Sequence, residues 1–265
     1  MNPVPQLMQR MRALLAGLVL LSGLMAPAMA QKPHNLTGGE LALLPEYCNQ
    51  TMGMYPGAQP GTMGPDSKRW LTLMGRSFMA MHHYCWGLIN ERRAQASGTP
   101  RVRRDFLLRH AGGDYRYVLT NAEPGFRLLP EIFVKLGDIH ALLGESATAI
   151  DAYQQAVLAQ PSWWRPYSRW AEVAKKAGLP KMAMAQLEAG LRMQPDSPEL
   201  RAQYKAYGGD ADKFVRSLPK REPAAAQPAD AAASAARPSA SAPAPAASDG
   251  LSAAPPSAAA SAQGG

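Results

Sequence analysis

Cysteine is scarce in this chain, and the short motifs that mark common enzymes are missing. Of 265 residues only Cys48 and Cys85 are cysteines, and they do not form a Cys-x-x-Cys pair. There is no Gly-x-Ser-x-Gly, no His-Glu-x-x-His, no phosphate-binding glycine loop and no dinucleotide fingerprint. The carboxylates are scattered, and none is paired as glycoside hydrolysis requires. We therefore predict a protein that is not an enzyme, with no catalytic residue, no cofactor and no resident metal.

A long apolar run is also missing. The most apolar segment spans only Ala13–Leu24, whereas a helix that crosses a membrane needs about 20 such residues. Arg10 and Arg12 precede the segment, and Ala28-Met29-Ala30 follows it. A basic start, a short apolar centre and small residues at the end predict a cleaved signal peptide over residues 1–30, hence a periplasmic or secreted protein. No cysteine follows directly, which argues against a lipid anchor.

Aromatic residues are absent from the C-terminal part of the sequence. Residues 222–265 are almost wholly Ala, Pro, Ser and Gly, a composition that cannot bury enough apolar surface to order a chain. We predict a disordered tail there. Residues 31–66, which are rich in Gly, Pro and Met, predict an irregular N-terminal segment.

Between these parts, residues 130–163 and 164–197 align with an offset of 34 residues. Small residues and prolines coincide: Gly144 with Gly178, Ala149 with Ala183, Ala156 with Gly190, and Pro161 with Pro195. Apolar spacing predicts helices near 130–143, 146–159, 164–177 and 180–193. This pattern resembles the tetratricopeptide repeat (TPR). The resemblance implies an all-α, short right-handed solenoid of helical hairpins.

Two repeats are fewer than a solenoid usually needs, so flanking helices should cover both ends. We expect a helical region over 67–129, with residues 67–96 as a long helix or hairpin. Within it, Arg103–Asn121 would be the second helix of a degenerate repeat, interrupted at Gly112-Gly113. A capping helix is expected within 198–218.

The resemblance also implies a ligand groove along the first helix of each repeat. The matching positions in the first repeat include Glu131, Val134 and Asp138, followed by Ala141 and Leu142. In the second repeat they are Arg165, Ser168, Glu172, Lys175 and Lys176. Arg169 lies one turn from Arg165, so both could grip a carboxylate or phosphate. Trp163, in the turn between the repeats, is a candidate exposed anchor. A charged, solvated helix face is the alternative interpretation.

The two cysteines of an exported chain predict a disulfide between Cys48 and Cys85. The alternative is a soft-metal, copper-type or redox site built from these cysteines with His82 and His83. Because the two histidines are adjacent on a helix, we expect one to pack beside Trp86 and the other to be exposed.

The formal net charge is +8. Export argues against a nucleic-acid partner, so the basic run Arg101, Arg103, Arg104 and Arg109 indicates an anionic envelope polymer, a membrane surface or a simply solvated face. Taken together, the sequence predicts a non-catalytic periplasmic adaptor. It would bind a protein or peptide in a TPR-like groove, in an envelope or polysaccharide-export assembly.

Overall fold

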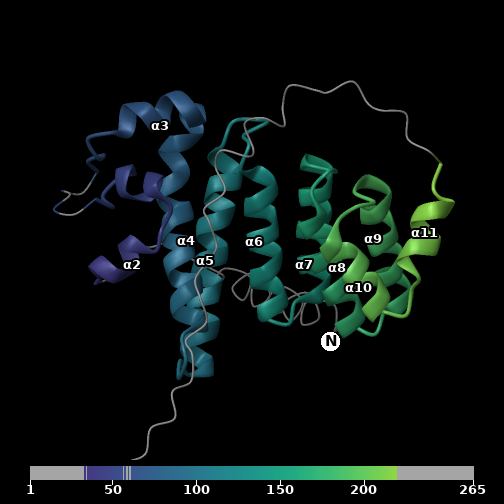
Figure 1. The fold of residues 1–265 in the computed structure, drawn as a ribbon. Helices are drawn as coiled ribbons and strands as arrows, with labels where there is room; N and C mark the ends of the chain where they lie inside the picture. The colour runs from purple at the N-terminus through teal and green to yellow at the C-terminus, as the bar shows by residue number, and fades with distance from the viewer. Residues whose placement is uncertain (1–32, 34, 56, 58, 60, 220–265) are drawn as a thin grey trace, which may run out of the picture. The chain divides into compact units, whose positions relative to one another are not determined.

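The computed structural model describes residues 33, 35–55, 57, 59 and 61–219. These residues form helices and no β-strand (Figure 1). In chain order the α-helices are α2 (Gly38–Ala42), α3 (Ser67–Met74), α4 (Met81–Gln95), α5 (Arg101–Asn121), α6 (Leu129–Leu142), α7 (Ser146–Ala159), α8 (Trp164–Lys176), α9 (Pro180–Met193), α10 (Pro198–Ala206) and α11 (Ala211–Ser217). Two 3-10 helices are η1 (Glu46–Gln50) and η2 (Gly75–Ala80).

Two predicted segments, the signal peptide at 1–30 and the tail at 222–265, lie outside the described residues. Within the described part, no helix combines the length and the apolar character that crossing a bilayer would require.

Consecutive helices pair as three hairpins, α4–α5, α6–α7 and α8–α9. Each hairpin packs on the next, because α5 contacts α6 and α7 contacts α8, and α10 then packs on α8 and α9 (Figure 1). This stack confirms the predicted all-α solenoid of helical hairpins. The α6–α7 and α8–α9 hairpins occupy the two segments that align at an offset of 34 residues.

Two of the repeated residues owe their positions to the hairpin turns. Gly144 and Gly178 follow α6 and α8 with φ of +80° and +77°. Side chains rarely tolerate this conformation, so glycine ends each first helix at the same place in both repeats.

A second pair of equivalent positions sets how closely the helices of a hairpin approach. In α6–α7 a Cβ atom on Gly137 would lie 2.4 Å from a ring carbon of Tyr153, which is 1% exposed. In α8–α9 the corresponding residues are Ala171 and Leu187, both fully buried. In each hairpin a small residue of the first helix thus faces a large residue of the second. The pair is glycine and tyrosine in α6–α7, and alanine and leucine in α8–α9.

The α4–α5 hairpin contains the same close approach. A Cβ atom on Gly87 would lie 2.5 Å from the ring of Tyr115, which is fully buried. This hairpin is longer, since α5 has 21 residues and α7 has 14. The greater length hides the correspondence from a search at a fixed period.

The N-terminal segment is fastened to the outer side of α4. Cys48 and Cys85 are bonded, with their Cα atoms 5.7 Å apart. Arg93 donates from Nη2 to Oε2 of Glu40 over 2.9 Å, and the hydrogen bonding of this pair is the main reason that the pKa of Glu40 falls to about 2. Met54, within this segment, is almost fully buried, and its sulfur accepts a hydrogen bond from the Trp86 indole of α4 over 3.2 Å. These contacts make the segment part of the folded unit.

The structure differs from the expected helices in three places. Residues 67–96 divide into α3, η2 and α4 at Gly75, whose φ is +61°. No break occurs at Gly112-Gly113, because α5 runs through them and Gly112 lies against α6. The segment 198–218 holds two helices, α10 and α11, rather than one.

Candidate protein-interaction surface

The predicted groove residues belong to α6 and α8, the first helices of their hairpins. These two helices contact each other, and α10 contacts α8. Side chains on their shared surface are linked from one helix to the next, and the centre of the linkage is Asp138 of α6.

Asp138 is a buried carboxylate with partners from two neighbouring helices. Tyr153 of α7 donates its hydroxyl to Oδ1 over 2.9 Å, and Arg169 of α8 donates from Nε to the same atom over 2.8 Å. Arg169 also donates from Nη1 to Oε2 of Glu172 over 2.7 Å. The structure therefore joins three predicted residues, Asp138, Arg169 and Glu172, into one network. The side chain of Asp138 is only 8% exposed.

The electrostatics of this network keep its charges in place. Burial by itself would lower the pKa of Arg169, but the hydrogen bond and negative charge of Asp138 outweigh burial and raise it. Burial, and then the charge of Asp138, raise the pKa of the Tyr153 hydroxyl. The tyrosine thus stays a donor and the guanidinium stays charged throughout the physiological range.

An equivalent network lies one hairpin earlier, and our sequence reasoning missed it. Tyr115 of α5 donates its hydroxyl to Oε2 of Glu91 in α4 over 2.7 Å. Lys135 of α6 pairs with the same oxygen at 3.1 Å. In both networks a second-helix tyrosine and a cation from the next hairpin meet on a first-helix carboxylate. The sequence signal was Gly87 followed by Glu91 on one helix face, with a tyrosine in the next helix.

Several predicted groove residues contribute to packing. Val134 is 2% exposed and lies in a core cluster with Tyr153. Ser168 is also buried, and its carbonyl accepts a hydrogen bond from Gln203 of α10 over 3.2 Å. Glu131 is half-buried and accepts the Tyr84 hydroxyl over 2.5 Å. These three side chains support the surface and leave little of themselves for a ligand.

The accessible residues of the candidate site lie on α8 and just before it. Arg165 is exposed, and none of the described residues forms an ion pair or hydrogen bond with its side chain. Lys175 is exposed and lies over the Tyr207 ring, 3.7 Å from its centroid. Lys176 is exposed, whereas Trp163 is half-buried against the α6–α7 core. The surface available to a partner is therefore mainly cationic.

The two adjacent histidines are both buried, which corrects the expectation that one is exposed. Their ring centroids are 4.4 Å apart, and both rings contact Trp86. His83 is joined through Nδ1 to Oδ1 of Asp114 at 2.8 Å, while Nδ1 of His82 lies 2.9 Å from the Met79 carbonyl. The α5 helix covers the α4 face that sequence reasoning left to solvent.

Burial changes the protonation of this cluster. It lowers the pKa of His82 to about 4, helped by the charge of His83, and it raises the pKa of Asp114. Because Cys48 and Cys85 are bonded to each other, they present no thiolates to a soft metal. Within the described part of the chain, no group of three or more His, Cys, Asp or Glu residues is arranged to hold a metal ion.

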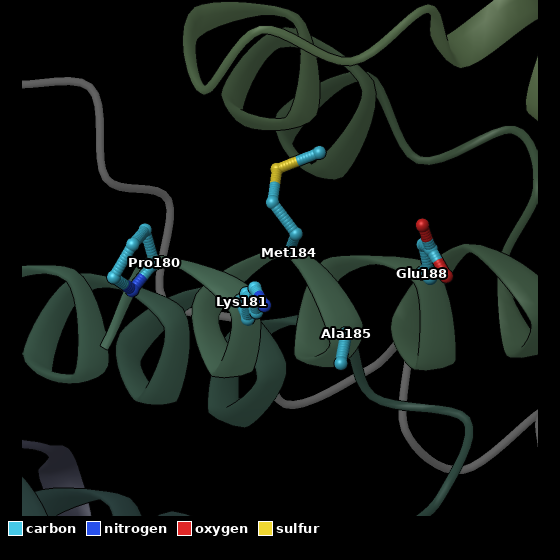
Figure 2. Close-up of a pocket in the computed structure, with 5 residues that line it drawn as sticks. All are labelled: Pro180, Lys181, Met184, Ala185 and Glu188. Carbon is cyan, nitrogen blue, oxygen red and sulfur yellow. The ribbon is translucent and has the colours of Figure 1, made fainter.

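An open depression lies along α9, as Figure 2 shows. It is lined by Pro180, Lys181, Met184, Ala185 and Glu188. All five come from one helix, so no second element contributes a polar group that would fix a small ligand. None of the predicted site residues lies there.

Comparisons with known proteins found similar chains among solved structures. No protein-family model matches the chain, and no curated protein matches it. Among solved structures, a thermophilic TPR protein of Thermus thermophilus is similar over 54% of this chain and 69% of its own, with 22% identity and a TM-score of 0.42. The first TPR domain of Spaghetti (RPAP3), solved with the HSP90 peptide SRMEEVD, is similar over 46% of this chain and 90% of its own, with 16% identity and a TM-score of 0.34. Both of these solved structures are of TPR proteins.

Proposed function

We propose that this protein is a non-catalytic adaptor that binds a protein or peptide on the first-helix surface of its solenoid. The observation that carries this proposal is the pair of networks centred on Glu91 and Asp138, which hold α4, α6 and α8 in register. A surface whose supporting side chains are locked by neighbours is preorganised, and preorganisation reduces the ordering cost of binding.

The charge of this surface favours an acidic partner. The carboxylates of Asp138 and Glu91 already have cationic partners. Arg165, Lys175 and Lys176 remain exposed on α8. A peptide with carboxylates spaced along it would complement these cations.

An exported location is part of the same proposal. The basic and apolar pattern of residues 1–30 is that of a signal peptide, and a bond between Cys48 and Cys85 suits an oxidising compartment. In that setting the adaptor would act in the periplasm, within an envelope or polysaccharide-export assembly.

The test is a cross-linking pull-down from the native envelope, followed by identification of the partner by mass spectrometry. The variant R165E/K176E reverses two exposed charges of the surface without removing an internal contact, so we expect it to lose the partner. The matched control K181E/K213E reverses two exposed lysines on α9 and α11 and should recover it fully. Equal recovery by both variants would exclude the α8 surface.

Arg169 is unsuitable as the test residue. Its side chain bonds both Asp138 and Glu172, so reversing its charge would disturb the fold as well as the surface. Export is measured separately, by locating the protein in fractionated cells and sequencing its N-terminus, with Gln31 expected as the first residue.

A further inference from the structure

The first two turns of α5 extend past the neighbouring hairpin. Arg109 of α5 pairs with Glu145, in the turn between α6 and α7, at 3.1 Å. Residues 101–106 precede this contact, and Arg101, Val102, Arg103 and Phe106 are exposed, whereas Leu107 and Leu108 are buried in the core.

Apolar side chains are exposed on this overhanging part. Val102 is 84% exposed and Phe106 is 55% exposed, and they lie one helical turn apart. The Phe106 ring contacts His110, one turn further along, with centroids 4.3 Å apart. Single exposed apolar residues are ordinary, but two on one face of a projecting helix form a small ridge.

Arginines flank the ridge in an arrangement that does not favour the helix. Arg101, Arg103 and Arg104 all lie in the first turn of α5, which has no acidic residue. Cations at a helix N-terminus oppose the helix dipole. Asp105, one turn from Arg101, pairs with Arg101 at 3.7 Å and with Arg104 at 3.1 Å, whereas Arg103 forms no ion pair with any described residue. An external anion would relieve this excess of positive charge.

We propose that the start of α5 docks on a membrane surface rich in anionic phospholipid, through the apolar ridge of Val102 and Phe106 and the flanking Arg101, Arg103 and Arg104. The guanidinium groups would bind lipid phosphates while the two apolar side chains enter the boundary between headgroups and acyl chains. This combination is what an interfacial helix uses. It is independent of the peptide-binding surface on α8.

The apolar pair selects lipid over a soluble anionic polymer. A polymer would be held by the arginines alone, and exposed Val102 and Phe106 would add nothing to its binding. A bilayer rewards both features, because insertion removes apolar surface from water. The contribution of Phe106 therefore separates the two kinds of partner.

The experiment is co-sedimentation of the purified protein with vesicles. The protein is produced with its own N-terminal segment, so that the cell processes it normally. Vesicles of phosphatidylglycerol mixed with phosphatidylcholine are compared with pure phosphatidylcholine. We expect binding to the anionic vesicles only, weakened by added salt.

Variants then locate the contact. R101Q/R103Q should weaken partition about 25-fold, at about fivefold for each arginine near the surface. F106A should weaken it by about tenfold. The matched control K181Q/K213Q removes two exposed lysines elsewhere and should bind more than the arginine variant. Circular dichroism and thermal unfolding verify that each variant folds.

Three outcomes would overturn the proposal. They are absence of binding to anionic vesicles at low salt, equal loss in R101Q/R103Q and the control, and full binding by F106A. Binding to a soluble anionic polysaccharide that depends on the arginines but not on Phe106, without vesicle binding, would assign the ridge to a polymer instead.

Discussion

The close approach of α6 and α7 at Gly137 gives a stringent test of the packing in the solenoid. Replacing Gly137 by alanine places a Cβ atom 2.4 Å from the Tyr153 ring. The ring cannot move aside easily, because it is buried and its hydroxyl is bonded to Asp138. Overpacking of this kind costs about 1–3 kcal/mol, and we expect the upper end here. Better helix propensity returns about 1 kcal/mol, which leaves a net loss of about 2 kcal/mol.

The assay is urea unfolding of G137A, with G112A as the control. An alanine Cβ at Gly112 would lie 3.4 Å from Ile139, an ordinary contact, so G112A should be as stable as the wild type or more so. The effect of G137A should then vanish in a Y153L background, because the next hairpin packs Ala171 against Leu187 in this way. If G137A costs the same in both backgrounds, the contact with Tyr153 is not its cause.

Three further predictions concern other parts of the molecule. The pKa of His82 is about 4 in the folded protein, so this side chain binds almost no proton at pH 5, whereas it is largely protonated in the unfolded chain. The contribution of His82 to stability is therefore fully present above pH 6.5 and declines as the pH falls below that value. Unfolding titrations at pH 7 and pH 5 should differ by about 2 kcal/mol more in the wild type than in H82Q. Reducing the bond between Cys48 and Cys85, or replacing both by serine, should lower stability by about 3–4 kcal/mol, since it opens a loop with a sequence separation of 37; thiol titration with and without reductant checks that the bond is present. The free energy of unfolding of R169A should be about 1–2 kcal/mol lower than that of the wild type, because the variant leaves a buried carboxylate with one partner fewer. That of R165A should stay within about 0.5 kcal/mol of the wild type. Chemical unfolding of both variants tests this, and equal losses would contradict it.

The two regular hairpins were predictable because the residues that end their first helices act locally. Gly144 and Gly178 are needed for turns with positive φ, and such requirements repeat at a fixed spacing. The observed bounds of α6 to α9 differ from the expected helices by at most a residue at either end. Glycine does not end α5, however, because Gly112 serves helix–helix contact. The residue type alone does not distinguish a turn from a close approach.

The candidate site was less predictable, because its contacts join distant parts of the sequence. Lys135 and Glu91 belong to different hairpins, and neither is marked by its neighbours along the chain. Position counting placed Val134 on the surface, yet it is buried. It gave Arg165 and Arg169 similar roles in binding a ligand. In the structure Arg165 is exposed, whereas Arg169 is bonded to Asp138.

The two networks centred on Glu91 and Asp138 have a consequence for the order in which the solenoid opens. A buried carboxylate seals the junction between the first and second hairpins, and another seals the junction between the second and third. Where α8 meets α10, the described polar contacts are a single amide hydrogen bond from Gln203 and a cation over the Tyr207 ring. Separating either of the first two junctions breaks a charge-assisted hydrogen bond that is largely shielded from water, whereas peeling α10 from α8 breaks a neutral hydrogen bond and a cation–ring contact. The chain should therefore unfold locally from α11 and α10 inward. Loss of α10 would expose the part of α8 that α10 covers before either hairpin junction opens.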